Sequence, residues 1–91
     1  MKKRYVIKVT AKDIKNGLPE EGNFCAIALA LKRKFKKGCY VDAEQISIGG
    51  YLASIPLQRD INKIDRFIEN FDDATRRRYC RPFSFILTKD I

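Results

Sequence analysis

Two short runs of basic residues carry the most distinctive chemistry of this sequence. Residues 32–37 include five cations, and residues 76–81 include four with a tyrosine among them. Arginine makes planar, bidentate contacts with phosphate and stacks on bases, and an adjacent tyrosine offers a stacking surface for single-stranded nucleic acid. The runs therefore predict a binding site for nucleic acid or a nucleotide. Its residues would be Lys32, Arg33, Lys36, Lys37, Arg76, Arg77, Arg78, Tyr79 and Arg81.

The whole chain is basic, with a formal net charge of +8 and an isoelectric point near 9.6. Such a chain attracts polyanions through solution, whether nucleic acid, nucleotides, an acidic protein surface or an anionic membrane. The alternative for each basic run is a solvated helix end or a charged loop without a ligand. Charge by itself does not choose among these partners.

Catalysis within this chain is disfavoured because its 91 residues include no histidine. That absence removes Ser–His and Cys–His nucleophile pairs and mixed Cys/His zinc sites. Cys25 falls in the first turn of a predicted helix, where the helix dipole lowers a thiol pKa. A cysteine-dependent enzyme is therefore a third hypothesis beside the two binding functions compared at the end of this section. The neighbouring Phe24 and Ala26 favour a buried structural thiol instead. We expect a protein that is not an enzyme and uses no cofactor or metal.

Cysteine spacing and hydropathy indicate a cytoplasmic protein. Cys25, Cys39 and Cys80 are odd in number and widely spaced, which is typical of reduced, partly buried thiols. Lys8 and Lys12 interrupt any signal-peptide core after the basic start. No run approaches the roughly 20 apolar residues that span a bilayer, so we expect no membrane partner.

The first elements follow from alternation and capping signals. Residues 4–10 predict a strand, because β-branched and aromatic side chains alternate there. Thr10 and Asp13 have the spacing of a capping box, which predicts a short helical turn that ends near Gly17.

The first long helix is predicted over residues 24–37. Asn23 is a good N-cap for it, and Gly38 is the expected stop. Ala26 and Ala30 lie one turn apart, so this helix can approach a sheet or a partner closely.

The middle of the chain reads as two strands. Residues 39–48 predict the second strand, and Gly49-Gly50 is a two-residue hairpin signal. A third strand then runs to Ile55, where a proline ends it.

The second long helix, over residues 58–71, has the clearest amphipathic stripe. On its solvent side, Asp60 with Lys63 and Arg66 with Glu69 predict favourable i,i+3 ion pairs. The stripe consists of Ile61, Ile64, Phe67, Ile68 and Phe71.

A last strand over residues 81–88 completes a β-α-β-β-α-β order within a single α+β domain that spans residues 1–91. This order predicts a ferredoxin-like split βαβ fold, with a four-stranded antiparallel sheet and both helices on one face.

Several motifs resemble those of a group of short uncharacterised bacterial and phage proteins. They are the run Cys25-Ala26-Ile27-Ala28-Leu29-Ala30-Leu31, the helix end with Phe67, Ile68, Phe71 and Asp72, and the strand Pro82-Phe83-Ser84-Phe85. The group carries no activity that transfers to this chain. The resemblance implies a phage-type accessory protein, which would act by binding host or defence components.

Two functions are therefore weighed against each other. The first is a small, basic, non-enzymatic binding protein for nucleic acid or a nucleotide. The alternative is a protein–protein inhibitor or adaptor, for example a phage anti-defence protein that binds a host complex. It would use the small-residue part of the first helix, or its basic face against an acidic protein surface. A homodimer through the open sheet face or through Ala26 and Ala30 is compatible with both functions.

Overall fold

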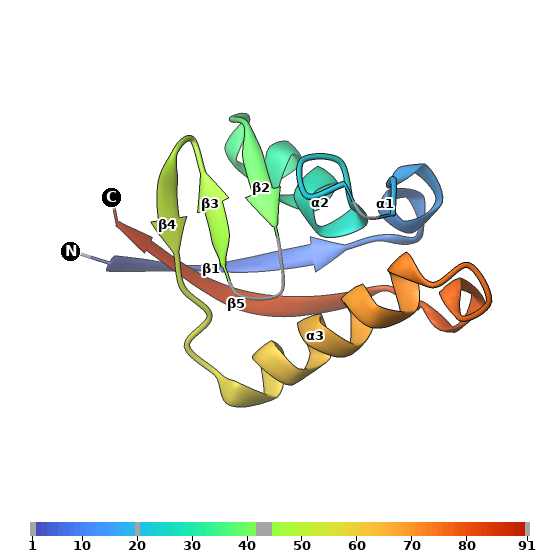
Figure 1. Cartoon of the computed structure of the whole chain (residues 1–91). Coiled ribbons are helices and arrows are strands. Elements are labelled where there is room, and N and C mark those ends of the chain that lie inside the picture. Colours follow the sequence, from blue (N-terminus) through green and yellow to red (C-terminus); the bar gives the residue numbers. More distant parts are fainter. Residues whose placement is uncertain (1, 20, 42–44, 91) are drawn as a thin grey trace.

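Two long strands with alternating burial form the centre of the fold. The structure is a computed structural model that describes residues 2–19, 21–41 and 45–90. It pairs β1 (Lys2–Val9) with β5 (Phe83–Asp90) in antiparallel register, with Ile7 opposite Phe85. Alternate side chains of a strand point to opposite faces, so the face with Ile7 and Phe85 is buried, whereas the face with Val6 is exposed. Because Lys2 pairs with Asp90, the start of β1 and the end of β5 lie side by side at one end of the molecule (Figure 1).

A second sheet is formed by the short strands β2 (Cys39–Val41), β3 (Ile46–Ile48) and β4 (Tyr51–Ala53), all antiparallel. The predicted hairpin is confirmed: Gly49 and Gly50 have φ of 59° and 86°. Both angles lie in the left-handed region that a type I′ turn requires and that glycine adopts without strain.

The predicted single strand over residues 39–48 is in fact two strands, and side-chain parity explains why. Cys39, Val41, Ile46 and Ile48 are all buried. Because strand side chains alternate, one straight strand would point the first pair and the second pair to opposite faces. Folding the chain back between them lets all four face the core, with Cys39 opposite Ile48. Asp42 and Glu44, which fall within the predicted strand, lie outside the described residues.

Among the described residues, one isolated bridge joins the two sheets. Ser54, just after β4, exchanges backbone hydrogen bonds with Thr88 of β5 at 2.9 and 2.8 Å. The α+β class is confirmed, but the structure shows a two-stranded and a three-stranded sheet rather than one four-stranded sheet. In the expected ferredoxin-like order the first strand lies beside the hairpin, whereas here the last strand does. The whole forms one globule with a radius of gyration of 12.1 Å.

Two short-range predictions about the first helices have different outcomes. The capping box is confirmed at α1 (Ala11–Asn16), where Thr10 Oγ1 accepts a hydrogen bond from the Asp13 N–H at 3.2 Å. The next helix, α2 (Ala26–Phe35), is shorter than predicted, because Cys25 is its N-cap and Lys36 ends it in a left-handed conformation with φ of 58°. Asn23 caps nothing there and donates instead to the Cys39 carbonyl at 3.5 Å.

The small residues of α2 serve the interior of this domain. Ala26 and Ala30 are 0% and 2% exposed, and a Cβ built at Gly17 would lie 2.5 Å from the Ala26 nitrogen. The chain after α1 thus packs directly on the start of α2. The partner and dimer surface predicted at Ala26 and Ala30 is therefore wrong, because the domain itself covers these residues.

The longest helix, α3 (Gln58–Asp72), matches its prediction closely. Ile64, Phe67 and Phe71 of its stripe are buried. Figure 1 shows α3 beside β5 and α2 on the side of β1, followed after α3 by the short 3₁₀ helix η1 (Arg77–Tyr79). Within the described part of the chain, none of the helices is long and apolar enough to span a membrane.

Candidate anion-binding groove

A groove of about 250 Å³ lies between α3 and the segment that leads from η1 into β5. Asn62, Arg66 and Asn70 line it from successive turns of α3, since residues four apart share one helix face. Tyr79 and Arg81 line it from the other side. Both belong to the second basic run, so the structure places part of the predicted site here.

Three cations surround the groove, and none of the described residues that line it is acidic. Lys63 Nζ is oriented by the Ser84 carbonyl at 2.9 Å and by Asp60 Oδ1 at 3.2 Å. The predicted Asp60–Lys63 pair is therefore confirmed, but its predicted place on the solvent side is wrong for Asp60, which is buried. Arg81 Nη1 donates to the Cys80 carbonyl at 3.0 Å. Arg66, the third cation, forms no hydrogen bond or ion pair with any described residue, so its predicted pairing with Glu69 is not found.

Aromatic rings form the apolar part of the same groove. Phe67 and Phe83 both line it, with ring centroids 4.9 Å apart. Tyr79 is 56% exposed, and the Arg78 guanidinium lies over its ring at 5.1 Å while donating to its hydroxyl at 3.1 Å. A flat, exposed ring flanked by a cation is a surface on which a planar group can stack.

One residue that lines the groove also has a buried polar atom without a partner in the described part of the chain. The amide oxygen of Asn70 is buried and has no hydrogen-bond partner among the described residues. Leaving such a group unpaired costs about 1–3 kcal/mol, and because the oxygen is buried, a ligand in the open groove does not reach it in this arrangement. By contrast, the Asn62 amide oxygen already accepts a hydrogen bond from Gln58 at 3.0 Å.

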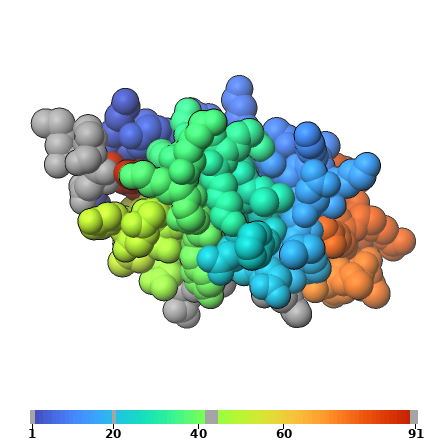
Figure 2. All heavy atoms as spheres, turned by 90° about the horizontal axis from the view of Figure 1, so that it is seen from above, coloured from blue at the N-terminus to red at the C-terminus, as the bar shows by residue number. Residues whose placement is uncertain are grey.

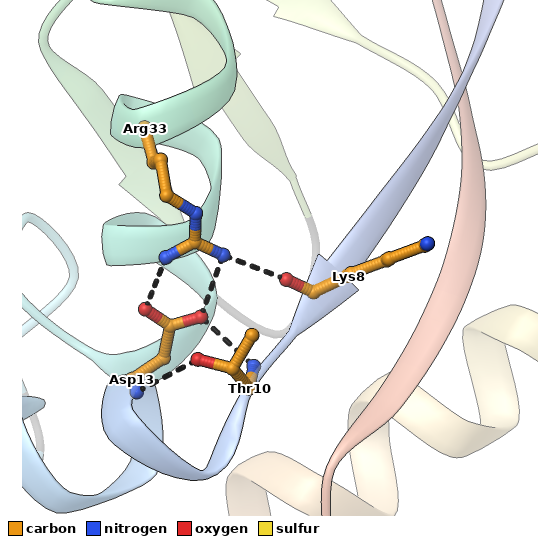
Figure 3. A network of polar contacts seen from close by, with 4 residues as sticks. All are labelled: Lys8, Thr10, Asp13 and Arg33. Atoms are coloured by element: carbon orange, nitrogen blue, oxygen red, sulfur yellow. Dashed lines mark hydrogen bonds and ion pairs between the residues drawn. The ribbon is translucent and has the colours of Figure 1, made fainter.

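The first basic run has a different environment (Figure 3). Arg33 forms a bidentate pair with Asp13, at 2.6 and 3.0 Å, and also donates to the Lys8 carbonyl at 3.0 Å. Burial raises the pKa of the Asp13 carboxyl, but hydrogen bonds from Arg33 and Thr10 outweigh it and hold the pKa below 3.8. Arg33 thus fixes α1 to α2 and β1, and its position is explained without a ligand.

The other residues of the first run are spread around the end of α2. Lys32 donates to the Asn23 carbonyl and lies 4.0 Å from the centre of the Phe24 ring. Lys36 ends the helix, and the stem of Lys37 lies along the turn glycine Gly49. None of these residues lines the groove beside α3.

One arginine of the second run is also structural. Arg77 Nη2 donates to the carbonyls of Ile14 and Gly17 at 3.0 and 2.8 Å, and its guanidinium lies 4.2 Å from the Phe71 ring centre. It therefore attaches the end of α1 to the end of α3. Arg76 is exposed. Hydrogen bonds from Thr75 lower the pKa of the neighbouring Asp73 carboxyl, and the charge of Arg76 acts in the same direction.

The two predicted basic runs do not form one surface. In Figure 2 the green segment that ends α2 and the orange segment after α3 lie apart, with the blue atoms of α1 between them. Arg33 binds one end of α1 and Arg77 the other. The predicted site is thus divided, and Tyr79 and Arg81 are the members that line the groove.

Sequence reasoning missed the contribution of α3 to this groove. Lys63 and Arg66 were interpreted as members of surface ion pairs, and Asn62 and Asn70 were not considered. The available signal was their spacing of three to four residues, which places them on one helix face. The spacing gives no indication that residues 79–83 pack beside that face.

The three cysteines of the chain are unpaired and buried. Cys25 lines a second hollow of about 250 Å³ together with Glu21 and Asp72. Burial raises the pKa of the Cys25 thiol, and backbone N–H groups of Ala28 and Ile27 offset this only in part. A raised pKa disfavours the thiolate that a nucleophile needs.

Comparisons with known proteins add no further information about this site. No family model, curated protein or solved structure matches this chain. Across residues 2–19, 21–41 and 45–90, no cluster of three or more His, Cys, Asp or Glu side chains is placed to hold a metal ion.

Proposed function

We propose that this chain is a small, non-enzymatic binding protein for single-stranded nucleic acid, which it holds in the groove between α3 and residues 79–83. The observation that carries the proposal is the combination of three cations and an exposed tyrosine around one open groove. Phosphates would contact Lys63, Arg66 and Arg81, and a base would stack on Tyr79.

The size of the groove favours a strand over an enclosed nucleotide. Sites that bury most of a small ligand have volumes of about 300–1,000 Å³, whereas this groove measures about 250 Å³ and is open to solvent. One base fits such a space while its neighbours continue along the surface. Such a protein is compatible with the phage-type accessory role that the sequence resemblance implies.

Binding of a fluorescently labelled oligothymidylate, measured by polarisation at several salt concentrations, tests the proposal. Neutralising Arg66 with glutamine should reduce the slope of log affinity against log salt by about 0.7, the value expected for one phosphate contact with a single strand. Tyr79→Ala should weaken binding by about fivefold or more, because one stacked base contributes about 1–3 kcal/mol.

Lys12→Gln is the matched control. Lys12 is exposed on α1, and this change removes the same charge as Arg66→Gln without touching the groove. The control should bind within about twofold of the parent protein. If both variants lose affinity equally, the attraction is diffuse and the groove is not the site. If a mononucleotide displaces the labelled oligothymidylate as well as an unlabelled oligothymidylate does, the ligand of the groove is a nucleotide instead.

Purification offers an independent measurement. The chain has four tyrosines and no tryptophan, so bound nucleic acid dominates its absorbance at 260 nm. We expect a high ratio of absorbance at 260 to 280 nm at low salt that falls as salt is raised. A ratio typical of protein alone at every salt concentration would contradict the proposal.

A further inference from the structure

The outer edge of β5, away from β1, is closed by partners. The Ile86 N–H donates to Asp60 Oδ2 at 3.0 Å, and the Ser84 carbonyl accepts from Lys63 at 2.9 Å. Thr88 exchanges two backbone hydrogen bonds with Ser54. In an antiparallel pair, the N–H and C=O of one residue point to the same side and successive residues alternate sides. Ser84, Ile86 and Thr88 therefore point away from β1.

The same rule defines the outer edge of β1. The register partners of Ser84, Ile86 and Thr88 are Lys8, Val6 and Arg4. Their backbone groups consequently point away from β5. Here the Lys8 carbonyl accepts from Arg33, and the other outward N–H and C=O groups of these three residues have no hydrogen-bond partner within the described part of the chain.

A groove of about 360 Å³ runs beside this free edge. Val6 and Lys8 line one wall, and Ala30, Arg33 and Lys34 of α2 line the other. Val6 is 54% exposed although it is a β-branched apolar residue in mid-strand. An extended segment in this groove would gain backbone partners on one side and apolar contact from Val6.

Charge decides what kind of segment fits. Arg33 is paired with Asp13, but Lys8 and Lys34 line the groove and are exposed, and no acidic side chain lines it among the described residues. Arg4 is exposed farther along the same strand. Cations on an edge strand oppose pairing with a second copy of the same strand, because like charges would then face each other. The carboxylates of an acidic strand, by contrast, would lie opposite these cations and be attracted to them.

We propose that the free edge of β1 docks an extended acidic peptide of a partner protein, which adds to the β1–β5 ribbon as a further strand. This inference goes beyond the nucleic-acid groove, which lies beside α3 and shares no lining residue with it. Backbone hydrogen bonds to Arg4 and Val6 give the register. Carboxylates of the peptide contact Arg4, Lys8 and Lys34.

The test uses the full chain and a labelled peptide of alternating glutamate and valine. Amide hydrogen exchange, followed by NMR, reports the edge directly. On addition of this peptide the N–H groups of Val6 and Lys8 should become protected, while those of Tyr5 and Ile7, already bonded to β5, should change little. The proposal would be overturned if none of these amides became protected. It would also be overturned if their protection rose with protein concentration in the absence of the peptide.

A variant separates strand addition from charge attraction. Val6→Pro removes one outward N–H and no hydrogen bond to β5, a position where an edge strand tolerates proline. Val6→Pro should lower the affinity for the peptide of alternating glutamate and valine about tenfold, whereas the affinity of Val6→Thr should stay within about twofold of that of the parent protein. A peptide with the same glutamates but proline in place of valine should bind as weakly to the parent protein. Equal binding of both peptides would refute strand addition, and this comparison does not depend on the variant folding.

Discussion

Asp60 takes the place of a neighbouring strand at the outer edge of β5, and its substitution should lower the free energy of unfolding. The residue is 3% exposed. Its carboxylate accepts the Ile86 N–H at 3.0 Å and pairs with Lys63 at 3.2 Å, and Lys63 in turn donates to the Ser84 carbonyl. One ion pair therefore satisfies two backbone groups of β5. Asp60→Ala leaves the Ile86 N–H without an acceptor.

The magnitude follows from these contacts. A hydrogen bond to a charged group contributes about 1.5–3 kcal/mol. The pair with Lys63, whose side chain is 47% exposed, adds at most about 1 kcal/mol. Asp60→Ala should thus lower the free energy of unfolding by about 3 kcal/mol. In a domain of this size that corresponds to a Tm lower by roughly 12–24 °C. Asp60→Asn keeps an acceptor but loses the charge, so about half of this effect is expected.

Thermal unfolding followed by circular dichroism measures the loss of stability, and hydrogen exchange locates it. The Ile86 amide should exchange faster in Asp60→Ala, while the Phe85 amide, bonded to β1, should keep its relative protection. Asp65→Ala on the same helix is the control and should change stability by less than about 0.5 kcal/mol. A loss below about 1 kcal/mol for Asp60→Ala, or an unchanged Ile86 amide, would refute the edge-capping argument.

Three further predictions concern stability. Lys36→Gly should raise the free energy of unfolding by about 1 kcal/mol in urea titration, because glycine adopts the positive φ of this position without a Cβ clash; a decrease would contradict this. Arg77→Ala should lower it by about 2 kcal/mol through two lost carbonyl contacts, whereas Arg76→Ala should leave it unchanged, and equal effects would show that Arg77 does not attach α1. Burial raises the pKa of Asp13 and Asp60, but hydrogen bonds outweigh it, so both pKa values lie below 3.8. Since the unfolded state then binds protons more readily, these two residues should stabilise the fold fully above about pH 4 and lose this contribution as the pH falls through their folded pKa values. An acid titration of Tm checks this, and a Tm that rises below pH 4 would contradict the sign.

Local signals in the sequence predicted local structure well. The capping box of Thr10 and Asp13, the Gly49-Gly50 hairpin and the helix over residues 58–71 all depend on interactions within a few residues, and all three were found. The start of α2 was predicted at Phe24 after an Asn23 cap but lies at Ala26, where the helix packs against Gly17. A capping preference of about 1 kcal/mol does not outweigh such a contact.

The sequence predicted the chemical character of the candidate site but not its position in the fold. Composition and the two basic runs determined that the chain is cationic, lacks histidine and offers arginine beside tyrosine. Only the tertiary structure decided how these cations are used. It assigns Arg33 and Arg77 to the two ends of α1, where they bind Asp13 and backbone carbonyls.

The same holds for the two surfaces proposed here. The groove combines one face of α3 with residues 79–83, and the free edge of β1 follows from its pairing with β5, which is about 80 residues distant along the chain. Sequence periodicity reports which side of an element is apolar, because that depends on near neighbours. Which elements lie side by side depends on the lowest free energy of the whole core, so the partners of each cation are decided only when the chain has folded.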